Sequence, residues 1–204
     1  MLTSNHLSHA DAPVLSSTLR RNGYQDIAGR VINILGIRIM KHPIAGFLAA
    51  SYPHIVVWPR AEETKNDIEE MARKRYNNTA LKAAKTALEL GQIISLFPQG
   101  GRAYSTVIEK PINPRDLVYT TLVKGTNIVP IGQWGLEKIL PRKKWIPRPN
   151  TTFTIVGKPY PVSEIVQSGH IIPTQKEADE IMLRVARLLP DRYRGYYSEP
   201  QNQQ

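Results

Sequence analysis

The sequence predicts an α/β fold with a mostly parallel central sheet flanked by helices. Two observations support this prediction. Short apolar runs of strand length, such as 93–97 and 127–131, alternate along the chain with helical stretches, such as 63–89 and 175–189. Glycines and prolines stand between these runs, where turns are needed. Strands that alternate with helices are typical of layered folds built on a parallel sheet.

The clearest helical signals lie near the start and in the middle of the chain. A helix is expected over 9–21, with Ser8 as its N-cap and Pro13 in its first turn. The stretch 63–89 is charged on one side and apolar on the other, and we expect an interruption near Asn77–Asn78. The remaining expected elements are strands over 2–4, 55–58, 93–97, 127–131 and 151–156, an apolar segment over 31–40, and helices over 43–51, 114–123 and 175–189.

Length and composition favour a single domain. A chain of 204 residues with 41% hydrophobic content can bury one sizeable core, so we expect one domain over residues 1–197. Residues 198–204 are polar and carry three glutamines, which predicts a disordered tail. The sequence has no cysteine, which excludes disulfides, thiolate zinc sites and cysteine nucleophiles.

The net charge points to anionic partners. A formal charge of +10 favours nucleic acid, phosphorylated metabolites or an acidic membrane surface. No apolar stretch approaches the roughly 18 residues that a spanning helix needs, and the N-terminus lacks the pattern of a secretory signal. We therefore expect a cytoplasmic protein whose membrane attachment, if any, is peripheral on the inner face. The basic segment 142–145 with Arg148 is a candidate for that contact, and a solvated basic loop is the alternative.

The first candidate for chemistry is the pair His6 and Asp11. They stand five positions apart, where a strand is followed by a helix, so a turn can bring the carboxylate back to the imidazole. A carboxylate on one ring nitrogen fixes the tautomer and raises the basicity of the other nitrogen, as a general base requires. The alternative is a helix cap beside a first-turn acid. A metal site with His9 is a weaker alternative, because no further ligands stand at suitable spacing.

The second candidate is the segment Phe97–Arg102, which follows an apolar strand. Gly100 and Gly101 allow a tight turn with exposed amide donors, and the Arg102 guanidinium suits a phosphate or carboxylate. The segment predicts an anion site; the alternative is an ordinary turn with an exposed arginine. Arg60 follows the strand 55–58, and it would lie at the same sheet edge if the three strands were parallel neighbours.

Taken in order, these residues resemble the glycerolipid acyltransferase family. The family's first motif resembles Asn5–Asp11, its second resembles Arg60 after a short strand, and its third, Phe-Pro-Glu-Gly-Thr-Arg, resembles Phe97–Arg102. The fourth, an apolar strand with a central proline, is similar to 128–131 with Pro130, and the ending 189–197 is similar to that of some members. The likeness spans nearly the whole chain, although relatives have a longer N-terminus, so we expect the chain to be truncated there.

The resemblance implies a glycerol-3-phosphate acyltransferase-like fold and an activity. The expected reaction moves an acyl group from acyl-CoA or acyl carrier protein to a hydroxyl of glycerol-3-phosphate or lysophosphatidic acid, without a cofactor or metal. His6 is then the base and Asp11 its partner. The acceptor phosphate is expected at Arg60, Gly100, Gly101 and Arg102, and Pro130 is expected to line the acyl site.

Two departures from the family pattern bear on the acceptor. Gln99 stands where most members have Glu, and Gly101 stands where most have Thr. The Gly-Gly-Arg form resembles the soluble plastid-type enzymes and favours glycerol-3-phosphate, although Tyr104 stands where those relatives have a further Arg. A degenerate relative that binds lipid without turnover is one alternative. A basic nucleic-acid-binding module is another, but the basic residues are scattered and form no such motif.

Overall fold

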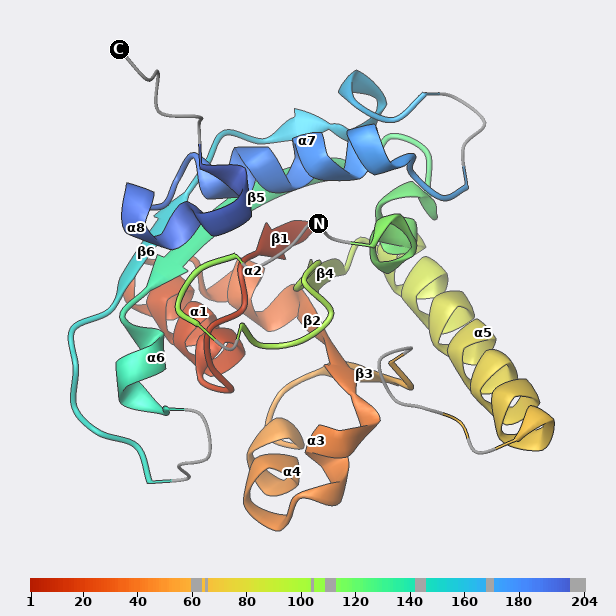
Figure 1. Ribbon diagram of the computed structural model, residues 1–204, viewed down its shortest axis with the longest axis horizontal. Helices are drawn as coiled ribbons and strands as arrows, with labels where there is room; N and C mark the ends of the chain where they lie inside the picture. Colours follow the sequence, from red (N-terminus) through yellow and green to blue (C-terminus); the bar gives the residue numbers. More distant parts are fainter. Residues whose placement is uncertain are drawn as a thin grey trace.

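The protein has an α/β fold built on a seven-stranded sheet, as the computed structural model shows (Figure 1). The strand order is β3-β2-β4-β1-β5-β6, and β7 also pairs with β5. Strands β1 to β5 pair in parallel, whereas β6 and β7 run antiparallel to β5. The strands are β1 Leu2–Ser4, β2 Val31–Gly36, β3 His54–Val57, β4 Ile93–Leu96, β5 Asn127–Trp134, β6 Phe153–Val156 and β7 Tyr160–Pro161. The structure describes residues 1–59, 64, 66–103, 105–108, 113–141, 146–167 and 171–198.

Helices cover both faces of the sheet. On one face, Leu15 of α1 packs with Leu2, Val31 and Ile131 of three strands. On the other face, α5, α7 and a 3-10 helix over Pro114–Thr121 pack on strand residues such as Ile94 in the larger core. The helices are α1 Asp11–Arg21, α2 Gln25–Arg30, α3 Ile37–Lys41, α4 Pro43–Ala49, α5 Asp67–Glu89, α6 Leu136–Ile139, α7 Gln175–Ala186 and α8 Asp191–Arg194. None of the helices in the described ranges is long and apolar enough to cross a membrane.

Two of the expected elements take a different form in the structure. The segment 31–40 divides at Gly36 into strand β2 and helix α3. The expected break at Asn77–Asn78 was wrong, because α5 runs without interruption from Asp67 to Glu89. The Asn77 side chain instead points away from α5 to Trp58. Its Oδ1 accepts the Trp58 N–H and its Nδ2 donates to the Trp58 carbonyl, at 2.8 Å each. This tertiary contact explains the asparagine in the middle of the helix, and helix propensity alone does not take it into account.

Parallel pairing brings the carboxyl ends of the strands to one edge of the sheet. Strand β1 lies between β4 and β5, so the loop after β1 lies beside the segment that follows β4. Strand β3 is at the sheet edge, and β2 separates it from β4. The strand before Arg60 is therefore parallel to the other two but not their direct neighbour. This edge is where open α/β sheets place their ligand sites.

Candidate active site

The loop between β1 and α1 begins with a buried asparagine that continues the sheet through its side chain. Asn5 is 1% exposed; its Nδ2 donates to the Gln133 carbonyl oxygen at 2.8 Å, and its Oδ1 accepts from the Gln133 backbone N–H at 2.9 Å. The last backbone pair between β1 and β5 joins Ser4 and Ile131. One residue later, the two side-chain bonds of Asn5 take the place of backbone hydrogen bonds between the strands. The backbone is thereby free to turn away from the sheet and carry His6 out at its edge.

His6 and Asp11 are in direct contact. The His6 Nδ1 lies 2.8 Å from the Asp11 Oδ2, and the same oxygen accepts the backbone N–H groups of Leu7 at 2.7 Å and Ser8 at 3.0 Å. The Asp11 side chain is 1% exposed and that of His6 is 14% exposed. A buried carboxylate fixed by two amides keeps Nδ1 protonated, which leaves Nε2 as the ring nitrogen able to accept a proton.

The other carboxylate oxygen of Asp11 has a different environment. Asp11 Oδ1 is buried and has no hydrogen-bond partner within the described parts of the chain. The pair does not depend on a helix cap formed by His6, because Ala10 is the N-cap of α1 and makes no side-chain cap bond. Ser8 was expected to cap this helix; its hydroxyl instead donates to the Leu140 carbonyl at 3.1 Å and accepts from the Ala10 N–H.

The backbone of His6 is held from both sides by the segment that follows β4. Its N–H donates to the Gln99 Oε1 at 2.8 Å, and its carbonyl accepts the Ala103 N–H at 3.1 Å. The imidazole also stacks on the Phe97 ring, with centroids 4.6 Å apart and planes 24° from parallel. The two candidate segments of the sequence thus form one unit. The contact between Gln99 and His6 was not predicted from the sequence.

The segment after β4 begins with a tight turn. The Gly100 N–H donates to the Phe97 carbonyl at 3.1 Å, and Gly100 has a φ of 67°, a left-handed conformation that favours glycine. A Cβ at Gly100 would lie 3.1 Å from the Asp116 Oδ2. The expectation of exposed amides at both glycines therefore needs a correction at Gly100, whose amide is already used by the turn.

Both segments open into a large pocket at the carboxyl edge of the sheet. The pocket has a volume of about 1600 Å³ and is lined by His6, Gly100, Gly101 and Arg102, among others. Five described lining residues are cationic and two are acidic, so the pocket favours an anionic ligand. The cationic residues are Arg38, Arg73, Lys74, Arg102 and Arg115, and the acidic ones are Glu70 and Asp116.

Four of these cations were not predicted from the sequence as site residues: Arg38, Arg73, Lys74 and Arg115. Arg38 stands two residues after the end of β2, and this position could have identified it, because residues just after parallel strands share one edge of the sheet. Arg73 and Lys74 both pair with Glu70 one turn along α5. The Arg73 guanidinium, bonded to that carboxyl, lowers the pKa of Glu70 below its ordinary value.

Arg60 and the basic segment 142–145 are outside the described residues. Pro130 is buried in β5, where its carbonyl accepts the Gly157 N–H at 2.8 Å, and it is absent from the described lining of the His6 pocket. Its role in an acyl site stays a prediction. For a metal site with His9, no group of three His, Asp or Glu side chains suited to an ion occurs in the part of the chain that the structure describes.

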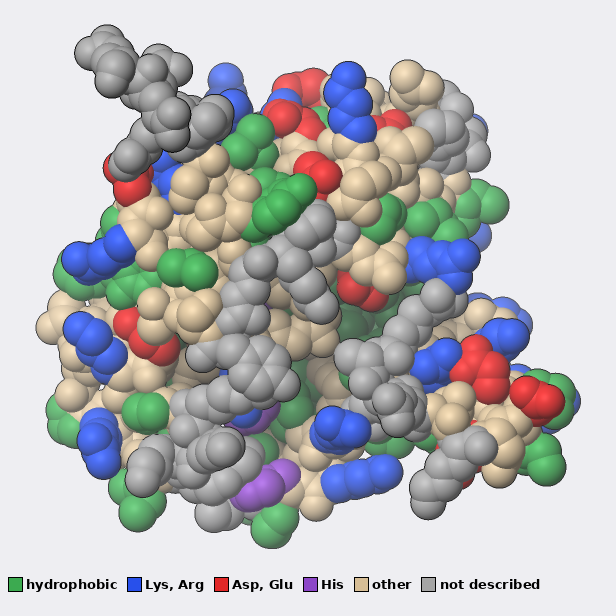
Figure 2. All heavy atoms as spheres, viewed as in Figure 1, with side chains coloured by type: hydrophobic (Ala, Val, Ile, Leu, Met, Phe, Trp, Pro, Cys, Tyr) green, Lys and Arg blue, Asp and Glu red, His purple; other side chains and the backbone are tan. Residues whose placement is uncertain are grey.

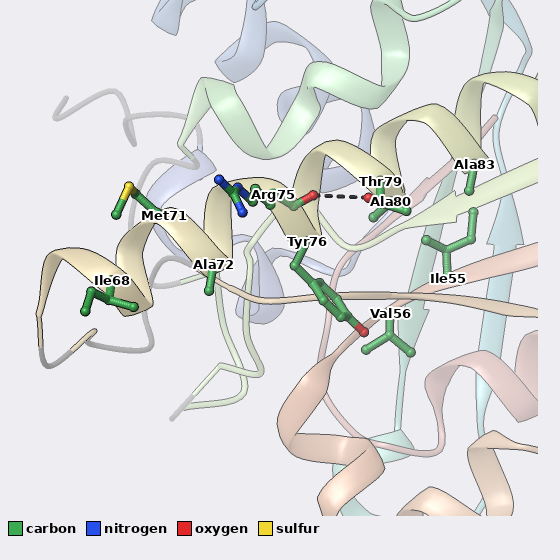
Figure 3. A pocket seen from close by; sticks show the side chains of 10 residues that line it. All are labelled: Ile55, Val56, Ile68, Met71, Ala72, Arg75, Tyr76, Thr79, Ala80 and Ala83. Carbon is green, nitrogen blue, oxygen red and sulfur yellow. Dashed lines mark hydrogen bonds between the residues drawn. The ribbon is translucent and has the colours of Figure 1, made fainter.

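A second, smaller pocket lies between α5 and the edge strand β3 (Figure 3). Its volume is about 760 Å³, and none of its lining residues also lines the His6 pocket. Figure 3 shows the Tyr76 ring extending from α5 toward Val56, with Ile68 and Met71 farther along the helix. The two pockets are therefore separate, and the catalytic candidates belong to the larger one.

Comparison with known proteins agrees with this arrangement. A family model described as Acyltransferase matches residues 1–134, which hold both segments around His6. The chain belongs to the acyltransferase family. An acyltransferase of solved structure, the 1-acyl-sn-glycerophosphate (LPA) acyltransferase PlsC from Thermotoga maritima, is similar in fold, with a TM-score of 0.60 at 18% sequence identity. The match covers 91% of this chain and 63% of that one. No curated protein matches.

Proposed function

We propose that this acyltransferase moves a fatty acyl group from acyl-CoA or acyl carrier protein to a hydroxyl of glycerol-3-phosphate or lysophosphatidic acid. The observation that carries the proposal is the contact of His6 Nδ1 with the buried Asp11 carboxylate, at 2.8 Å, in the loop that lines the large pocket. The pair supplies a base without a protein nucleophile, which suits direct attack by the acceptor. The sequence contains no cysteine that could form a thioester intermediate.

In the proposed reaction, the His6 Nε2 takes the proton of the acceptor hydroxyl as its oxygen attacks the thioester carbonyl carbon. Asp11 stabilises the imidazolium that forms. The tetrahedral intermediate then breaks its C–S bond, and the imidazolium returns the proton to the departing thiolate. One C–O bond forms and one C–S bond breaks, so the acyl ester and the free thiol are the only products.

The cations of the pocket support a phosphate-bearing acceptor. We assign the phosphate to Arg102 and Arg60, and the guanidinium of each suits a phosphate oxygen pair. Arg38 and Arg115 line the same pocket and add to its positive potential. Because the Gly100 amide is bonded to Phe97, the contribution to oxyanion binding falls to Gly101 in this proposal.

Gln99 also bears on the alternative of a degenerate, lipid-binding relative. A glutamine in place of the family's Glu is a warning of lost activity only if the carboxylate is needed. In this chain the amide oxygen of Gln99 holds the His6 N–H at 2.8 Å, so the backbone that carries the base is positioned without a charge. This favours an active enzyme over a degenerate one.

The test is thiol release from palmitoyl-CoA and from palmitoyl-acyl carrier protein, with glycerol-3-phosphate or lysophosphatidic acid as acceptor. We expect acceptor-dependent release that falls by about 10³-fold or more in His6→Ala, because the proposed base is removed. His54→Ala is the matched control, since His54 itself does not line the pocket and its loss should leave turnover near wild type.

Two outcomes would contradict the proposal. Acceptor-dependent release that survives His6→Ala would remove the base from the mechanism. A folded wild type that releases no thiol with any of the four donor and acceptor combinations would favour the degenerate relative. Comparison of the two acceptors also determines which of them the pocket takes.

A further inference from the structure

Helices α3 and α4 form a short hairpin that projects from the body of the protein beside β2 and β3 (Figure 1). Gly46 packs so closely on α3 that a Cβ there would lie 2.8 Å from the Met40 carbonyl oxygen. The outward side of this hairpin has a distinct composition. We call it the hairpin face and define it by its exposed residues Arg38, Lys41, Pro43, Phe47 and Ala50.

The apolar part of the hairpin face is a single helical stripe. Pro43, Phe47 and Ala50 are spaced by four and three residues along α4 and its end, so they share one side of the helix. All three are exposed, and Phe47 is 79% exposed, one of the largest exposed fractions among the hydrophobic side chains of the structure. A phenylalanine held this far into solvent contributes nothing to the core.

The charged part of the hairpin face carries only positive charge. Arg38 and Lys41 stand on α3, and the sequence contains no Asp or Glu between Asp26 and Glu62. Figure 2 shows blue Lys and Arg side chains in the lower part of the view, with purple His and green hydrophobic side chains nearby, where Figure 1 places α3 and α4. Cations that flank an exposed aromatic ring, with no acid among them, suit an anionic surface that has an apolar interior.

The same hairpin borders the His6 pocket. Arg38, Ile39, His42 and Ala45 line that pocket, so the hairpin face adjoins its rim. A lipid that leaves a bilayer beneath the hairpin face would therefore meet the pocket without crossing open water. A stable protein interface takes about 20 to 30 residues on each side, far more than this small face offers. A bilayer needs only a few inserted and charged side chains.

We propose that the hairpin face is the surface through which this protein rests on an anionic membrane. Phe47 inserts below the headgroups, while Arg38 and Lys41 contact lipid phosphates. Delivery of an acyl acceptor or removal of a product through this contact rests on the proposed function. Binding to the bilayer does not, because it needs no turnover.

The experiment is cosedimentation of the full chain with vesicles of phosphatidylcholine alone or with one third phosphatidylglycerol. We expect binding only to the anionic vesicles, weakened by salt. Phe47→Ser should weaken the apparent partition constant by about 10-fold, through loss of the inserted ring. Lys41→Glu should weaken it by about 30-fold, because it removes one cation and adds an anion near the surface.

The matched controls are Lys82→Glu on α5 and Leu90→Ser at its C-cap. Leu90 is 75% exposed and precedes β4 at the opposite edge of the sheet, and Lys82 is exposed outside both pockets. The same changes in chemistry should there leave binding within about 3-fold of wild type, since only long-range charge is altered. Lys41 and Phe47 do not line the pocket, so turnover of soluble glycerol-3-phosphate should be unchanged in both hairpin variants.

Several results would overturn the membrane surface: no binding of wild type to anionic vesicles, hairpin variants that bind as wild type does, or controls that weaken binding equally. A protein partner in place of the bilayer would also appear as absent vesicle binding. His6→Ala should bind vesicles as wild type does. If the protein binds vesicles through the hairpin face but transfers no acyl group, the proposed function fails and the membrane surface stands.

Discussion

At the scale of single residues, Gln99 determines how the backbone of His6 is held. Its Oε1 accepts the His6 N–H at 2.8 Å, while Ala103 donates to the His6 carbonyl from the same segment. A glutamate could accept the same bond, so the glutamine keeps the geometry and removes a negative charge from beside the imidazole. Geometry and electrostatics at this position are therefore separable by mutation.

We expect Gln99→Ala to lower kcat by about 10-fold or more, because the His6 N–H loses its partner and the base its position. Gln99→Glu should retain most of kcat and move the acidic limb of the kcat/KM profile to higher pH, since a nearby carboxylate favours the imidazolium. Both variants are to be compared over pH 5 to about 9, the range in which histidine titrates.

The control for the added charge is Gln92→Glu. Gln92 precedes β4 at the opposite edge of the sheet, so this change should leave the pH profile of kcat/KM in place. A profile of Gln99→Glu that coincides with that of wild type would show that residue 99 does not influence the base electrostatically. An unchanged kcat in Gln99→Ala would show that the hydrogen bond does not position it.

At the scale of elements, one side chain of α5 bonds the backbone just beyond β3. Strand β3 ends at Val57, and the next backbone group, that of Trp58, is bonded in both directions by Asn77 from α5. Because β3 is an edge strand, these bonds satisfy groups for which the sheet offers no partner beyond β3. The rim of the His6 pocket, which includes Trp58 and Asn77, depends on the same contact.

Replacing Asn77 by Ala should lower the free energy of unfolding by about 1 to 3 kcal/mol, because two partly buried backbone groups lose their partners. Asn78→Ala is the matched control: Asn78 is exposed, and alanine is the better helix former, so stability should stay equal or rise by about 0.5 kcal/mol. Urea unfolding followed by circular dichroism measures both. Equal stability of the two variants would mean that Asn77 does not anchor β3.

The sequence predicts local features of this protein better than its long-range contacts. The β4 run of 93–96 lies between Gly91 and Pro98, and the spacing of His6 and Asp11 is short enough to be interpreted directly. The bond from His6 to Gln99 spans 93 positions and depends on β1 lying beside β4, which no local pattern encodes. Segment 31–40 was ambiguous because its apolar residues fit both a strand and a helix.

At the scale of the whole molecule, buried tyrosines tie stability to alkaline pH. Burial, together with the Asp116 carboxylate, raises the pKa of Tyr119 to about 12, and burial also raises the pKa of Tyr160. Both groups bind their protons more tightly in the folded state. Their contribution is therefore complete below pH 10, the ordinary value, and is lost as the pH rises toward the folded-state pKa.

We expect the free energy of unfolding to fall by roughly 2 kcal/mol or more between pH 10 and 12, measured by urea titration at each pH. Tyr160→Phe should flatten this dependence. It should not destabilise the protein at neutral pH, because the Tyr160 hydroxyl is buried without a partner among the described residues. Tyr24→Phe, on a ring 54% exposed, controls for the loss of a hydroxyl. A Tyr160→Phe variant as pH-dependent as wild type would contradict this account.

The position of β1 also determines when the contact between His6 and Asp11 can form during synthesis. The first strand of the chain is inserted between β4 and β5, and Asn5 holds its loop to Gln133, 128 positions later. During synthesis on the ribosome, His6 and Asp11 emerge before β5, so their support is incomplete until β5 has also emerged. The order of translation thus delays the assembly of the site until β5 has been made, and a nascent chain that ends before β5 cannot hold Asn5 against Gln133.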